Sequence, residues 1–192
     1  MARAIFTTPG IVLTRGGVGE SSLLLSLLTR EYGRIEARAQ GARNAGSKLR
    51  FGLEPLHTGL FSLVKGVAGW KIVGVERAES LISSPAGVKT LGNITALLSR
   101  LAPPHEAVPA LFDLVRKDLF FLGATSDGDV LRNGECITVL HILSHLGYVP
   151  TTEGFAPFIE QESLTESLIE TMKPLRKEAV ILINTSLAAT GL

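Results

Sequence analysis

Hydrophobic and polar positions in the first 80 residues fall into short apolar runs separated by glycines, a pattern typical of β-strands. The clearest run covers residues 33–40, where Ile35, Ala37 and Ala39 alternate with charged or polar side chains. The pattern predicts five strands and a hairpin turn at residues 66–69. The predicted strands cover residues 10–15, 21–29, 33–40, 56–65 and 70–79. Without a crossover helix between them, these strands favour a small closed or nearly closed barrel of the OB type.

From about residue 81, apolar positions recur with the period of an α-helix. This period predicts helices at residues 86–101, 107–122 and 134–146, each stopped by proline or glycine. Further on, Ser163 and Glu166 have the spacing of a capping box. We expect Pro174 to separate a short helix from a final one over residues 177–183. The predicted fold class is α+β, with an OB barrel in residues 1–80 and an all-helical domain in residues 81–192.

Charge divides unevenly between these two predicted domains, although the net charge of the chain is only +1. Residues 1–80 contain 11 lysines and arginines against 6 carboxylates, a balance of +5. Residues 81–192 contain 8 and 12, a balance of −4. A basic first domain suits a polyanionic ligand, whereas an acidic second domain would repel nucleic acid and is better suited to protein partners.

The single cysteine, Cys136, excludes an internal disulfide and a zinc site built from several thiolates. It favours a reducing, cytosolic setting. No apolar stretch reaches the roughly 18 residues that would span a bilayer, so neither secretion nor membrane insertion is indicated. We expect no cofactor and no metal ion.

Residues 30–50 are the most informative segment because six cations there face only Glu31 and Glu36. On the predicted strand, Arg34 and Arg38 share the outward face, and the following glycine-containing loop continues the positive charge. Such a surface would hold phosphates without reading base sequence. The alternative is a solvated strand face that contributes only to solubility. The predicted DNA-binding cations are Arg15, Arg34, Arg38, Arg43, Lys48, Arg50 and Lys71, with Phe51 and Trp70 as candidates for stacking on bases.

Three weaker patterns point to other chemistry. Residues 41–48 have the glycine spacing of a phosphate loop, but Ser47 precedes Lys48, which is the wrong order for nucleotide binding. His141 and His145 are four residues apart, yet Cys136 falls off their helix face, so we interpret both as ordinary helix histidines. No set of nucleophile, base and orienting group is recognisable, and we do not expect an enzyme.

A series of motifs follows a characteristic order along the chain. They are residues 10–13, Arg15, 19–25, 28–33, 39–43, 47–50 and 53–55, with looser matches at 101–104, 110–112 and 146–148. Together these motifs resemble the RecO family of recombination mediators. The resemblance implies an OB barrel followed by a helical domain, in a cytoplasmic, nucleoid-associated protein. It also implies binding of single- and double-stranded DNA, strand annealing, and help in loading RecA.

The resemblance further implies two protein partners, RecR and the acidic tail of single-stranded DNA-binding protein. The cations available for that tail in the helical domain are Arg100, Arg116, Lys117 and Arg132. Some relatives carry a four-cysteine zinc module, which a chain with Cys136 alone cannot form, and the chain is shorter than typical members. The rival interpretation is a protein-interaction module whose barrel does not bind DNA.

Overall fold

The computed structural model describes residues 4–47, 49–149 and 154–189. The chain forms two compact units, each described by itself below. The barrel unit consists of Met1–Leu81 and Ala102–Pro109, and the helical unit of Ile82–Leu101 and Ala110–Leu192. Ala102–Pro109, which follows a helix of the other unit in the sequence, is therefore part of the barrel unit; we call it the strap.

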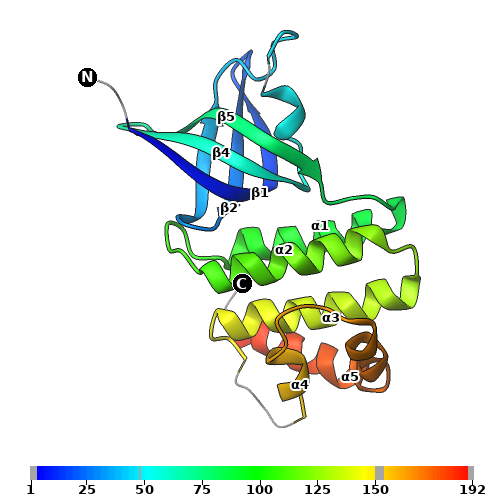
Figure 1. The fold of residues 1–192 in the computed structure, drawn as a ribbon. Coiled ribbons are helices and arrows are strands. Elements are labelled where there is room, and N and C mark those ends of the chain that lie inside the picture. Colours follow the sequence, from blue (N-terminus) through cyan, green and yellow to red (C-terminus); the bar gives the residue numbers. More distant parts are fainter. Residues whose placement is uncertain (1–3, 48, 150–153, 190–192) are drawn as a thin grey trace. The chain divides into compact units, whose positions relative to one another are not determined.

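The barrel unit contains five strands that close in the order β1-β2-β3-β5-β4 (Figure 1). All neighbours are antiparallel except β3 and β5, which run parallel. The predicted α+β class with an OB barrel is confirmed, and four of the five predicted strands match within one residue at each end. The strands are β1 Ile5–Val18, β2 Ser22–Thr29, β3 Gly33–Ala39, β4 His57–Gly66 and β5 Gly69–Ser80.

Strand β1 is longer than the pattern predicts because it serves two neighbours in succession. Its first half pairs with β4, from Ile5 opposite Val64 to Ile11 opposite Thr58. Its second half pairs with β2 as far as Val18 opposite Ser22, with a register shift between Val12 and Thr14. A bulge of this kind bends a strand, which lets one strand curve around the barrel.

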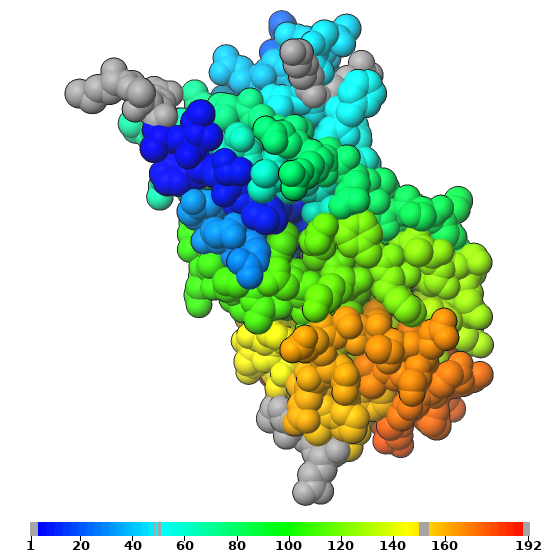
Figure 2. Space-filling view, viewed as in Figure 1, coloured from blue at the N-terminus to red at the C-terminus, as the bar shows by residue number. Residues whose placement is uncertain are grey.

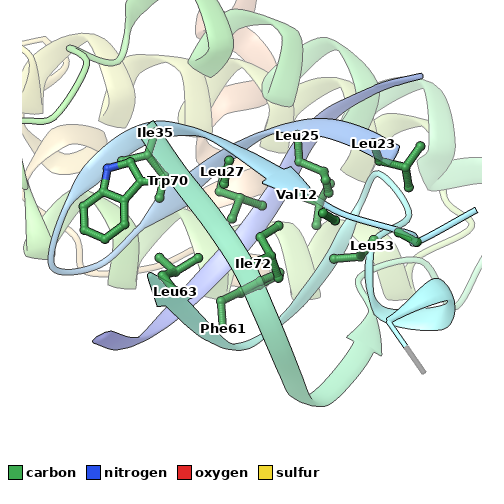
Figure 3. Packing of buried hydrophobic residues seen from close by; sticks show 13 residues of the cluster. Val12, Leu23, Leu25, Leu27, Ile35, Leu53, Phe61, Leu63, Trp70 and Ile72 are labelled. Carbon is green, nitrogen blue, oxygen red and sulfur yellow. The ribbon is translucent and has the colours of Figure 1, made fainter. Parts of the chain in front are cut away.

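Side chains that alternate along the strands fill the barrel interior (Figure 3). In β3 the predicted alternation is confirmed, because Ile35, Ala37 and Ala39 are buried while Glu36 and Arg38 are exposed. Leu25 and Leu27 of β2 and Phe61 of β4 are fully buried in the same cluster. Each such side chain contributes about 1.5–3 kcal/mol relative to an exposed one, so this interior sets the register of the outward faces.

The strap lies along β3, where β5 supplies little pairing. Strands β3 and β5 pair at only two positions, and Arg34 instead forms a parallel bridge with Pro104 of the strap. The Arg34 Nε donates to the carbonyl of Ala102 at 2.9 Å, and the His105 amide donates to the Arg34 carbonyl at 3.0 Å. Backbone and side-chain hydrogen bonds thus attach the strap to one residue of β3.

The helical unit contains α1 Val88–Leu101, most of α2 Pro109–Ala124, α3 Gly128–His145, α4 Ala156–Ile159 and α5 Glu166–Ala189. Short 3-10 helices, η1 Arg50–Gly52 and η2 Pro85–Gly87, lie in the barrel unit and before α1 respectively. The predicted positions of α1 and α2 agree with the structure to within two residues. Helix α3 begins six residues earlier than predicted, because Asp127 caps it by accepting from the amides of Asp129 and Val130 at 2.7 and 3.2 Å.

Two predictions for the end of the chain were wrong. Pro174 does not divide α5, which continues through it as one helix packed along α3. Proline removes a single backbone hydrogen bond, and buried Met172 and Ala179 hold the helix on both sides of it. The cap of α5 is Thr165 and not Ser163, since the Thr165 hydroxyl accepts from the Leu168 amide at 3.2 Å.

We predict that Gly33→Ala destabilises the barrel by about 3 kcal/mol or more. Gly33 has a φ of 64°, and an added Cβ would overlap the backbone of Glu106 in the strap. Gly19→Ala is the matched control, with a φ of 62° and no atom close to the added Cβ, and should cost only about 1 kcal/mol. Urea unfolding measures both, and equal losses would show that contact with the strap contributes nothing.

Candidate nucleic-acid interface

The outward face of β3 carries Arg34 and Arg38, as predicted from the sequence. Arg38 is exposed and Arg34 is half-buried, with exposed Glu36 between them. In the parallel pairing of β3 with β5, Arg38 lies opposite Lys71. Lys71 is half-buried between the buried side chains of Trp70 and Ile72. Because side chains alternate along a strand, Lys71 is directed outward and joins Arg38 on one face.

A groove of about 570 Å³ runs over this face. Its walls come from β3, from the hairpin between β4 and β5, from the end of β1 and from the strap. The lining residues are Val18, Leu24, Arg34, Glu36, Arg38, Ala68, Gly69, Trp70, Pro104 and His105. We call this the barrel groove; it lies where OB-folds commonly bind oligonucleotides, between the β2–β3 face and the loops that follow β1 and β4.

Positive charge dominates the barrel groove, in which Arg34 and Arg38 face a single carboxylate, Glu36. The bond from Arg34 Nε to the carbonyl of Ala102 fixes that guanidinium at the groove wall, next to His105. The structure therefore brings Arg34, Arg38 and Lys71 onto one side of the barrel.

Arg15 and Arg43 line a second, smaller hollow of about 220 Å³ together with Leu23, Ala42 and Glu54. Glu54 forms an ion pair with Arg15 and offsets its charge. The Arg43 guanidinium donates to the carbonyl of Gly19 at 3.1 Å, in the turn that follows Val18. Since Val18 also lines the barrel groove, Arg43 lies close to one end of that groove, whereas Arg15 is held by its carboxylate.

The two aromatic residues predicted to stack on bases have different surroundings. Phe51 is 80% exposed on η1 and does not line the groove. Trp70 lines it, but is only 6% exposed and belongs to the barrel core. Its ring packs against Phe6 and Tyr32, so it does not form the exposed stacking surface that the sequence suggested. Lys48 and the side chain of Arg50 lie outside the described residues.

The four cations assigned to partner binding have different surroundings within the helical unit. Arg132 is paired with Asp129 at 2.6 Å, which lowers the pKa of that carboxyl, and Arg116 lies over the Phe120 ring. Lys117 lines a hollow together with three carboxylates, and Arg100 is exposed in the last turn of α1. A joint role of these cations in partner binding stays a prediction.

The two histidines of α3 have separate environments. The His141 Nδ1 lies 2.9 Å from the Asp118 Oδ2, and both side chains are fully buried. The His145 Nδ1 lies 2.9 Å from the backbone carbonyl of His141. Asp118 also accepts from the Thr138 hydroxyl at 3.2 Å and from the Leu164 amide at 2.9 Å. This carboxylate joins α2, α3 and the segment before α5, which is a structural role.

Two residue groups were missed by sequence reasoning. Asp118 could have been noticed, because with Leu111, Val115 and Leu122 it has the spacing of one buried face of α2. Pro104 and His105 had no comparable signal, because they lie about 70 positions after β3 in a loop between helices.

Neither a cluster of metal ligands nor a membrane-spanning helix occurs in the part of the chain that the structure describes. In residues 4–47, 49–149 and 154–189, no group of three His, Cys, Asp or Glu side chains could hold a metal ion. Over the same ranges, every helix is too short or too polar to cross a bilayer.

The closed five-stranded barrel, with a basic groove on the face used by oligonucleotide binders, defines an OB-fold protein with an additional helical unit. Residues 1–80 match the family model described as "Recombination protein O N terminal". Residues 1–80 therefore carry the N-terminal domain of the RecO family, as the motifs indicated.

Curated relatives extend this similarity beyond the barrel. The DNA repair protein RecO of Heliobacterium modesticaldum is 31% identical over 149 residues, covering 76% of this chain and 53% of the relative. The protein of the same name from Gloeothece citriformis is 30% identical over 172 residues, covering 86% of this chain and 57% of the relative. This chain spans about half the length of the curated relatives it matches.

We predict that Asp118→Ala lowers the free energy of unfolding by about 3–5 kcal/mol, because it leaves the His141 ring, the Thr138 hydroxyl and the Leu164 amide buried without their common acceptor. Asp129→Ala is the matched control, which removes an exposed carboxylate of the same unit and should change stability little. Thermal and urea unfolding measure both. Similar losses for the two variants would contradict the role of the buried carboxylate.

A further prediction concerns the thiol of Cys136. Burial raises the pKa of this thiol above its usual value, and the neighbouring Glu135 adds to the effect. Because the thiolate is the reactive form, the folded chain should react with a disulfide reagent at pH 8 more slowly than the urea-unfolded chain. Cys136 is the only cysteine, so the whole signal belongs to it. Equal rates in the two states would contradict the prediction.

Proposed function

We propose that this chain acts in DNA repair by binding DNA without sequence preference through the barrel groove. The observation that carries the proposal is the register of β3 and β5, which brings Arg38 beside Lys71 on the outward face, with Arg34 in the same groove. The match of residues 1–80 to the RecO family supports it, as do the relatives named DNA repair proteins.

The chemistry of the groove favours contact with the phosphate backbone. Its polar side chains are two guanidinium groups, one imidazole and one carboxylate, to which Lys71 adds an ammonium group on the neighbouring strand. Arginine and lysine neutralise phosphates and release their counterions, which supplies affinity without information about base identity. Leu24, Trp70 and Pro104 add apolar surface to the groove, against which sugars and base edges can pack.

Glu36 and the strap restrict where phosphates can bind on this surface. Glu36 lies between Arg34 and Arg38 on β3 and repels a phosphate placed midway. Arg34 is anchored to the strap, so it presents a fixed guanidinium, whereas the exposed Arg38 is free to follow the ligand. We expect DNA to cross the face with phosphates near Arg38 and Lys71, with Arg43 extending contact at the end formed by β1.

The finer activities rest on the family resemblance. We propose that the protein anneals complementary strands, because neutralised phosphates reduce the repulsion between two DNA strands. Help in loading RecA, and contacts with RecR and with single-stranded DNA-binding protein, belong to the same proposal. An annealing assay with and without single-stranded DNA-binding protein tests strand annealing and its dependence on that protein.

The DNA-binding prediction is tested by salt titration. Affinity for a fluorescent single strand should fall with salt at a slope of about −0.7 for each phosphate contacted, when both quantities are plotted as logarithms. Replacing Arg38 and Lys71 together by alanine should weaken binding and reduce the size of the slope by about 1.4, because two phosphate contacts are lost. Arg34 is left unchanged, since its loss would also release the strap.

The matched control replaces exposed Lys89 and Lys177 of the helical unit by alanine, which changes the net charge by the same amount. This control should bind with unchanged slope. If both double variants behave alike, the attraction is general and the barrel groove is not the site. A flat titration of the unmodified chain would instead favour the protein-interaction module.

A further inference from the structure

Helix α2 has one face that borders two surface hollows of the helical unit. Its positions are three or four residues apart from Ala110 to Ala124, so they fall on one side of the helix. Two hollows lie along this side, one near each end of the helix. The α2 residues that line them are Ala110, Asp113, Leu114, Lys117, Phe121 and Ala124.

The first hollow has a volume of about 410 Å³. Its other lining residues are His145 and residues 159–162, which lie at the end of α4 and just after it. The second, of about 420 Å³, is completed by Thr125, Val130 and the first two turns of α5. Because Lys117 and Phe121 are one turn apart on α2, the hollows follow each other, and we call them together the α2 groove. In Figure 2 the orange surface around α4 and the start of α5 borders the green surface of α2.

The floor of the α2 groove is apolar and its rim is acidic. Leu114, Ile159 and Ile169 are buried at its base, and Phe121 and Val130 are half-buried beside them. Four exposed glutamates stand along the side opposite α2, two in each hollow. They are Glu160, Glu162, Glu166 and Glu170. On α2 itself, the lining carries one carboxylate, Asp113, and one cation, Lys117.

We propose that the α2 groove binds a basic amphipathic segment of a protein partner, with apolar side chains on its floor and lysines or arginines against the glutamate rim. An apolar groove binds an amphipathic helix through the apolar residues on one face of that helix, which recur every three or four positions. Charges on the rim of the groove favour a partner of opposite charge. A segment with acidic flanks would meet repulsion from four glutamates. The α2 groove belongs to the helical unit, whereas the barrel groove belongs to the barrel unit.

The length of the groove sets the size of the ligand. From Ala110 to Ala124 a helix rises about 21 Å, which accommodates a partner helix of about 14 residues. We expect each hollow to accept one apolar side chain of the partner helix, with the two side chains about two to three helical turns apart.

The test uses two labelled peptides of about 14 residues, with leucine on one helical face and either lysine or glutamate at all other positions. Fluorescence anisotropy measures their binding to the full chain at moderate salt. The lysine peptide should bind and the glutamate peptide should not. Replacing Glu160, Glu162 and Glu170 together by glutamine should weaken binding of the lysine peptide by about tenfold or more, because several rim charges act on one ligand.

The matched control replaces three exposed glutamates that do not line the groove, Glu20, Glu76 and Glu178, by glutamine. It makes the same change in net charge and should alter affinity less than about twofold. Ala124→Arg adds a cation at the exposed end of the groove and should weaken binding of the lysine peptide without affecting the fold. Circular dichroism and unfolding curves check that each variant remains folded.

Three results would overturn the proposal. Equal weakening by the two triple variants would mean general attraction to an acidic chain. Tighter binding of the glutamate peptide would identify an acidic partner segment instead. Undiminished binding of the lysine peptide to Ala124→Arg would place it elsewhere. Measuring DNA binding of the same variants keeps this test separate from the proposed function, since all of them should retain it.

Discussion

The short parallel contact between β3 and β5 is the constraint on which the barrel and its groove depend. Two residue pairs close the sheet, and the same two pairs place Arg38 beside Lys71. Beyond them, β3 continues without β5, and the strap contributes the backbone and side-chain contacts at Arg34. Backbone groups in a protein require partners, so the strap satisfies β3 at the point where the neighbouring strand no longer can.

The two units carry grooves whose linings have opposite charge. The barrel groove combines cations from adjacent strands, while the α2 groove is bordered by four glutamates. The difference follows the charge balance of +5 and −4 along the sequence, but the balance alone could not locate either surface. Separation of the charges lets one chain attract a polyanion with one unit and a cationic segment with the other.

Much of the fold could be predicted from sequence because local patterns decide it. Alternation in residues 33–39 fixed the inward and outward faces of β3, and hence the direction of Arg34 and Arg38. Errors occurred where tertiary contacts override a local signal, as at Pro174, where packing against α3 carries the helix through a proline. The surroundings of Arg15 and Trp70 likewise depend on residues that are distant in the sequence. Glu54 pairs with Arg15, and Phe6 and Tyr32 pack against Trp70.

The strap also determines how much of the chain is needed to form the complete barrel. The family match stops at residue 80, yet Arg34 and Gly33 are fitted to backbone that appears only after α1. A fragment cut at the family boundary would keep all five strands but lose the carbonyl that holds the Arg34 guanidinium and the wall formed by Pro104 and His105. The smallest piece able to reproduce the barrel as it exists in this protein therefore has to include α1 as a covalent bridge to the strap.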